Sequence, residues 1–84
     1  MTDPILLRGQ VRFILSSAPK GRYVSEDVIH AKLKADFPEV RVSETRVAIE
    51  WNHAKGLVTF TRNEEQERDE WMLTDAGREK EGLK

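Results

Sequence analysis

The sequence from Val42 to Val58, VSETRVAIEWNHAKGLV, contains a helix start, a helix body, a helix stop and the beginning of a strand in one short stretch. Ser43 is a good N-cap residue, because its hydroxyl group can accept a hydrogen bond from an unpaired amide of the first turn. Gly56 is the matching stop, since glycine adopts the left-handed C′ conformation without a Cβ clash. We therefore predict a helix over about residues 43–55, followed directly by a strand.

The size and composition of the chain limit the classes of function. The chain has 84 residues, a net charge of −1 and no cysteine. This length supports a single domain, 1–84, with a modest core and no room for a substrate cleft between two lobes, so we do not expect an enzyme. The N-terminal segment lacks the basic n-region of a signal peptide, and charged residues interrupt its apolar run. We therefore expect neither a signal peptide nor a membrane span there. We therefore expect a cytoplasmic protein.

The helix predicted over about residues 5–16 has more apolar residues than one buried face requires. Four of them recur at helical spacing and define that face. They are Leu7, Val11, Ile14 and Leu15. Ile5, Leu6 and Phe13 broaden the apolar stripe, which indicates either a well-buried helix or the surface of a homodimer.

A second helix is predicted after a turn and a short strand. The strand covers about residues 22–24, and the helix covers about residues 25–37. Ser25 is placed to cap the helix, with acidic residues in the first turn that suit the positive end of the helix dipole. Pro38 ends it, because the residue before a proline avoids the helical conformation.

The residues after Gly56 change from helical to alternating periodicity. Apolar and polar side chains alternate on two arms over about residues 57–73, which predicts a hairpin with a long polar tip. Thr74 follows the hairpin and is placed to cap a short helix over about residues 75–81. The order of elements is therefore a helix, a short strand, two further helices, a two-stranded ribbon and a final short helix.

Three segments of the chain resemble the winged helix-turn-helix superfamily. They are GRYVSEDVI (21–29), AKGLV (54–58) and WMLTDAGRE (71–79). Bacterial and phage transcription regulators of this fold commonly carry the last two as GLV and LTxxGR motifs. The resemblance covers nearly the whole chain. It implies an α+β winged-helix fold, with a three-helix bundle, a two- or three-stranded antiparallel wing and a short C-terminal helix.

The resemblance also implies how such a chain binds double-stranded DNA. The third helix would enter the major groove, and the wing would touch neighbouring phosphate or the minor groove. At the exposed start of the helix the candidate contacts are Ser43, Thr45 and Arg46. In the wing they are Arg62, Asn63 and Arg68. The implied function is that of a bacterial or phage transcription regulator. The broad apolar stripe of the first helix is the candidate contact of a homodimer.

The charge of the predicted wing departs from this pattern. Between Arg62 and Glu70 there are five acidic residues and two arginines, so phosphate should be repelled by the tip. Basic residues gather elsewhere, where they form either a phosphate-facing surface or an ordinary solvated surface. They are Arg8, Arg12, Lys20, Arg22, Lys32, Lys34 and Arg41.

The third helix has two possible registers. In the first register the core-facing residues are Thr45, Ala48, Ile49 and Asn52. In the second, Val47, Trp51 and Ala54 pack inward instead. An exposed Trp51 beside Val47 would resemble a protein-binding hot spot. The alternative function is therefore a protein-interaction or assembly module that uses Val47, Trp51 and the acidic wing.

The sequence predicts no catalytic residue, cofactor or metal site. His30 and His53 lie on different predicted helices without a third ligand at metal-binding spacing. The carboxylates near the wing lack the glycine-turned loop of a calcium site. Neither a phosphate-binding glycine loop nor a nucleophile motif occurs.

Overall fold

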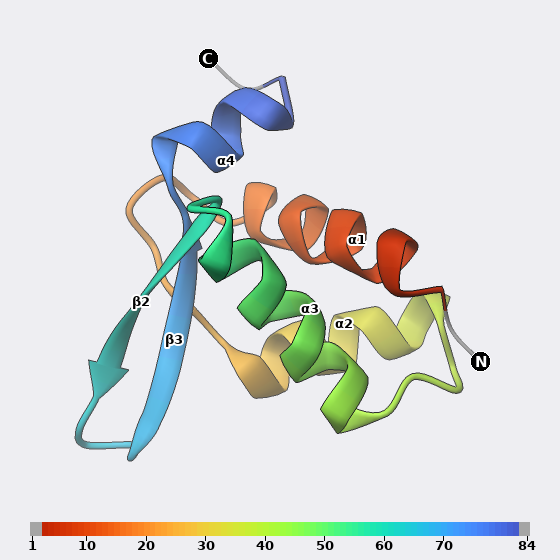
Figure 1. The fold of residues 1–84 in the computed structure, drawn as a ribbon. Coiled ribbons are helices and arrows are strands. Elements are labelled where there is room, and N and C mark those ends of the chain that lie inside the picture. Colours follow the sequence, from red (N-terminus) through yellow and green to blue (C-terminus); the bar gives the residue numbers. More distant parts are fainter. Residues whose placement is uncertain (1–2, 83–84) are drawn as a thin grey trace.

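The computed structural model describes residues 3–82 and contains, over that range, four helices and a three-stranded antiparallel sheet (Figure 1). The elements are α1 (Pro4–Ser16), β1 (Val24–Ser25), α2 (Glu26–Asp36), α3 (Val42–Ala54), β2 (Val58–Asn63), β3 (Arg68–Leu73) and α4 (Asp75–Lys80). The predicted α+β class is confirmed. Residues 1, 2, 83 and 84 of the predicted domain lie outside the described residues.

Helices α1, α2 and α3 pack around one core that also receives side chains from the sheet. Among the described residues, its buried apolar members are Leu7, Val11, Ile14, Leu15, Ile29, Leu33, Val40, Ala48, Ile49, Val58, Trp71 and Leu73. The cap of α2 is the residue that the sequence indicates, and α1 is capped by Asp3. The side chain of Asp3 accepts a hydrogen bond from the Ile5 amide at 2.9 Å, and Ser25 accepts one from the Val28 amide at 3.3 Å.

The start of α3 differs from the prediction. The helix begins at Val42 with Arg41 as its N-cap residue, so Ser43 lies inside the first turn. The Arg41 amide donates a hydrogen bond to Oε1 of Glu44 at 2.9 Å, and this carboxylate ties the chain that enters the helix to its first turn. The helix ends at Ala54, one residue before the predicted end, and Gly56 has the left-handed conformation that the sequence predicts there, with a φ angle of 73°.

Helix α3 adopts the first of its two possible registers, with Thr45, Ala48, Ile49 and Asn52 in the core. The side-chain amide of Asn52 can be buried because both its oxygen and its nitrogen are hydrogen-bonded. Its Oδ1 accepts from Nη1 of Arg12 at 2.9 Å. Its Nδ2 donates to the carbonyl oxygens of Arg8, at 3.1 Å, and Ala48, at 2.9 Å. Asn52 therefore joins α3 to α1.

The sheet has the order β1-β3-β2, and β2 and β3 form the wing (Figure 1). Phe60 of β2 is paired with Trp71 of β3, which in turn is paired with Val24 of β1. Thr74 joins the end of the wing to α4, since its hydroxyl group donates to the Gly56 carbonyl at 2.6 Å and accepts from the Gly77 amide at 3.1 Å. The two sequence motifs around Gly56 and Thr74 therefore meet at the base of the wing.

Candidate nucleic-acid interface

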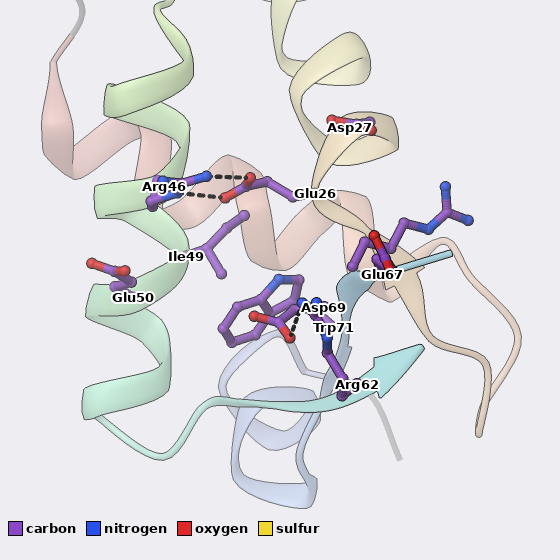
Figure 2. Close-up of a pocket in the computed structure, with 10 residues that line it drawn as sticks. Glu26, Asp27, Arg46, Ile49, Glu50, Arg62, Glu67, Asp69 and Trp71 are labelled. Carbon is purple, nitrogen blue, oxygen red and sulfur yellow. Dashed lines mark hydrogen bonds and ion pairs between the residues drawn. The ribbon is translucent and has the colours of Figure 1, made fainter. Parts of the chain in front are cut away.

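Helix α3, the start of α2 and the wing enclose a groove of about 450 Å³ (Figure 2). Ile49 and Trp71 lie between the helix and the wing and contribute apolar surface to this groove. Its charged side chains are five carboxylates and three guanidinium groups. They are Glu26, Asp27, Glu50, Glu67, Asp69, Arg46, Arg62 and Arg68. The groove is therefore polar, with an excess of negative charge.

Arg46 is exposed on α3 but is held by Glu26, the first residue of α2 (Figure 2). Its Nε donates to Oε1 of Glu26 at 3.2 Å, and its Nη2 donates to Oε2 at 3.1 Å. These hydrogen bonds, followed by the charge attraction to Glu26, raise the pKa of Arg46 above its ordinary value. A DNA contact by Arg46 would replace this bidentate pair with a pair to phosphate or to a base edge.

The wing candidates are also paired with acidic side chains. Nη1 of Arg62 lies 3.5 Å from Oδ1 of Asp69, directly across the two strands. Nη2 of Arg68 lies 3.2 Å from Oε2 of Glu70, and Nδ2 of Asn63 donates to the same oxygen at 3.4 Å. Ion pairs this exposed contribute little to stability. They therefore hold the wing arginines loosely.

The two hydroxyl candidates of α3 differ in accessibility. Ser43 is exposed in the first turn. Thr45 is fully buried, and its Oγ1 lies 2.6 Å from Nδ1 of His30 on α2. The expectation that Thr45 is exposed at the start of the helix is wrong, because it shares the core-facing row of α3 with Ile49 and Asn52.

Val47 and Trp51 lie on the side of α3 that faces α1. Val47 is 57% exposed, whereas Trp51 is half-buried beneath two cations. The guanidinium carbon of Arg8 lies 4.5 Å from the Trp51 ring centroid, and Nζ of Lys55 lies 5.7 Å from it. An apolar groove of about 170 Å³ lies beside Val47. It is lined by Pro4, Leu7, Arg8, Ser43, Glu44, Val47 and Ala48.

An aromatic cluster joins the end of α3 to the wing, and the sequence did not predict it. His53 makes edge contacts with Phe60, at 5.4 Å between ring centroids, and with Trp71, at 5.7 Å. The Phe60 and Trp71 centroids are 5.3 Å apart. The alternating pattern of the wing assigns Phe60 and Trp71 to a face of their own strands only. Whether the two rings lie opposite each other depends on the strand register, which is fixed by the length of the hairpin turn.

Neither a metal site nor a membrane span is found in the part of the chain that the structure describes. Within residues 3–82, no group of three or more His, Cys, Asp or Glu side chains is arranged to hold a metal ion. In the same range, no helix has the length and apolar character needed to cross a bilayer. His30 and His53 contact different partners, Thr45 for the first and Phe60 and Trp71 for the second.

Comparison with known proteins identifies the fold. No protein-family model and no curated protein matches the chain. Among solved structures, it is similar to the ferric uptake regulator Fur of Helicobacter pylori, described as having three functional metal-binding sites, with a TM-score of 0.72 and 10% sequence identity. The match covers 81% of this chain and 43% of the Fur chain. Since Fur is a winged-helix regulator, the similarity shows that this chain has the winged-helix fold.

Proposed function

We propose that this winged-helix chain binds double-stranded DNA and acts in the cytoplasm as a bacterial or phage transcription regulator. The observation that carries the proposal is the position of Arg46, Arg62 and Arg68, which all line the groove between α3 and the wing. In the winged-helix fold these are the two elements that approach the major groove and the neighbouring phosphates. The regulator Fur as a structural neighbour agrees with a role that is not enzymatic.

The proposed contacts use the exposed candidates on both elements. Arg46 reads a guanine edge or grips a phosphate, and Ser43 donates to phosphate. The wing residues that contact phosphate are Arg62, Asn63 and Arg68. Thr45 is left out because its side chain is fully buried. Binding exchanges internal carboxylate pairs for phosphate pairs, so we expect modest affinity that falls steeply as salt is raised.

Fluorescence anisotropy with a labelled duplex of mixed sequence tests this proposal. We expect binding in the micromolar range at low salt, with affinity that decreases linearly on a log–log plot against salt. Arg46→Ala should weaken binding about ten-fold, because it removes a charged contact from the centre of the interface. Lys80→Ala, a change at an exposed lysine of α4 outside the groove, is the matched control. No binding at tens of micromolar protein, or binding insensitive to salt, would contradict DNA binding.

A second function is favoured by a separate observation on α3. Val47 is largely exposed beside the apolar groove between α1 and α3, and the wing carries more acidic than basic groups. Such a surface fits a protein partner with an apolar anchor and basic flanks. Under this function, Val47→Asp or Trp51→Ala abolishes the affinity for an identified, purified partner, while Arg46→Ala leaves it unchanged. A large loss of thermal stability in Trp51→Ala would instead assign Trp51 to the core.

A further inference from the structure

Helix α1 exposes an apolar row on the side opposite its buried face. Ile5 is 71% exposed, Leu6 58% and Phe13 59%. Ile5, Gly9 and Phe13 are spaced i, i+4 and i+8, and Leu6 lies beside Phe13 at a spacing of seven residues, so they share one face of the helix. The residues that made the stripe of α1 unusually wide are therefore not part of the core.

This row is free of charge in a chain in which 35% of the residues are charged. Its three large side chains expose on the order of 300 Å² of apolar surface, a size at which a surface patch is often functional. The long polar side chains of α1 each contact another part of the molecule instead. Arg8 lies over Trp51, Gln10 donates to Asp36, and Arg12 contacts Asn52 and Glu81.

Gly9 lies at the centre of the row, and packing within the chain does not require a glycine there. A Cβ atom at this position would meet only Nη2 of Arg12, at the ordinary contact distance of 3.6 Å. A glycine also weakens the interior of a helix by about 1 kcal/mol relative to alanine. The structural consequence of Gly9 therefore lies on its outward side, where it leaves a gap between Ile5 and Phe13.

We propose that this row is the surface at which two copies of the chain associate, with their α1 helices antiparallel across a two-fold axis near Gly9. Ile5 and Phe13 each lie four residues from Gly9, so the axis brings Ile5 of one copy against the partner's Phe13 and the reverse. This reciprocal pairing is what a two-fold interface requires. The missing side chain at Gly9 lets the two backbones approach closely, and the large side chains on either side fill the space between them.

A second copy suits this surface better than a charged partner does. No side chain of the row can pair with a charge. The nearest charged group, the Arg12 guanidinium beside Gly9, is already bonded to Asn52 and Glu81. Burying an unpaired charge is costly. The row is instead complementary to itself. In Figure 1, α1 lies on the side of the molecule away from the tip of the wing, so association through α1 leaves the tip of the wing free. This proposal does not rest on DNA binding.

Sedimentation velocity of the whole chain without DNA, from 10 µM to 1 mM, tests the association. We expect the mass to rise with concentration from that of the 9.7 kDa chain toward twice that value. The apolar area is small for an interface, so the dissociation constant should be on the order of 100 µM. Phe13→Glu should raise it at least ten-fold. Val28→Glu, at an exposed apolar residue of α2, is the matched control and should leave it unchanged.

A second variant keeps the test decisive if Phe13→Glu does not fold, which circular dichroism will show. Gly9→Leu favours the helix but fills the gap at the crossing, so it should also weaken association at least ten-fold. A wild-type chain that stays monomeric at 1 mM would overturn the proposal. Gly9→Leu that associates like the wild type would overturn it as well. Because no DNA is present, either result leaves the proposed DNA binding untouched.

Discussion

Glu26 and Arg46 come from different helices, and their bidentate pair determines how accessible the central arginine of α3 is. We predict that Glu26→Gln raises DNA affinity by roughly ten-fold at low salt, because it releases Arg46 and removes a carboxylate from the groove. Asp27→Asn is the matched control, because Asp27 lines the same groove and its replacement by asparagine also removes one negative charge. Anisotropy titrations compare the three proteins. Equal gains in the two variants would show that Arg46 is not restrained by Glu26.

Asn52 is the buried residue with the most demanding hydrogen-bond requirement. Asn52→Ala leaves Nη1 of Arg12 without this acceptor and the Arg8 carbonyl without this donor. We expect it to lower the free energy of unfolding by about 2–3 kcal/mol. Urea denaturation followed by circular dichroism measures the change. Gln10→Ala, which removes an exposed side-chain amide bonded to Asp36, should cost less than about 0.5 kcal/mol.

The same residue shows where prediction from sequence ends. Helical spacing left two possible sets of core-facing residues on α3, and it did not show which set is buried. The choice depends on whether the amide of Asn52 finds partners in the core. One of those partners is Arg12, which lies 40 positions away along the chain. The pairing of Arg46 with Glu26 was missed for the same reason, because it depends on how α2 packs against α3.

At the level of elements, local signals predicted the boundaries better than they predicted contacts. Ser25, Gly56 and Thr74 act as the sequence indicates, since capping depends on residues within one turn. The start of α3 was misplaced because Ser43 is a good N-cap type. In the structure the N-cap is Arg41, two residues earlier, and its amide is held by the Glu44 carboxylate.

The junction between the wing and α4 leaves no room for a side chain at Gly77. A Cβ atom there would overlap the carbonyl oxygen of Leu57, which already accepts a hydrogen bond from the Thr74 amide at 3.0 Å. We predict that Gly77→Ala lowers the free energy of unfolding by at least about 2 kcal/mol, since backbone must move to relieve the overlap. Chemical denaturation provides the measurement. Ala76→Ser, at the exposed neighbouring position, should stay within about 0.5 kcal/mol of the wild type.

On the scale of the whole molecule, periods and caps predicted the elements, and the resemblance of three segments to winged helix-turn-helix proteins implied the fold that they form. This chain has the same fold as Fur, although only 10% of the residues are identical in the matched part. The fold depends on which positions are apolar, whereas binding depends on which charges stand on the surface. The acidic wing and the paired arginines are therefore properties of this chain that the fold does not supply.

Association through α1 predicts a stability that depends on protein concentration. A dimer that forms only from folded chains adds stability by mass action. Between 10 µM and 1 mM, we expect the Tm of the wild type to rise by about 3–6 °C. Phe13→Glu should show a constant Tm over the same range. Reversible calorimetric scans check this. A constant Tm for the wild type would speak against an association coupled to folding.

The two tryptophans of the chain occupy different surroundings, and this gives the molecule a built-in optical reporter. Trp71 is almost completely buried and lines the groove between α3 and the wing, whereas Trp51 lies half-buried beneath Arg8. In Trp51→Phe, all indole fluorescence comes from Trp71, and its emission should lie to the blue because water is largely excluded. A ligand that enters the groove should change this emission, whereas a partner that docks on α1 should not. One unlabelled titration therefore distinguishes the two surfaces.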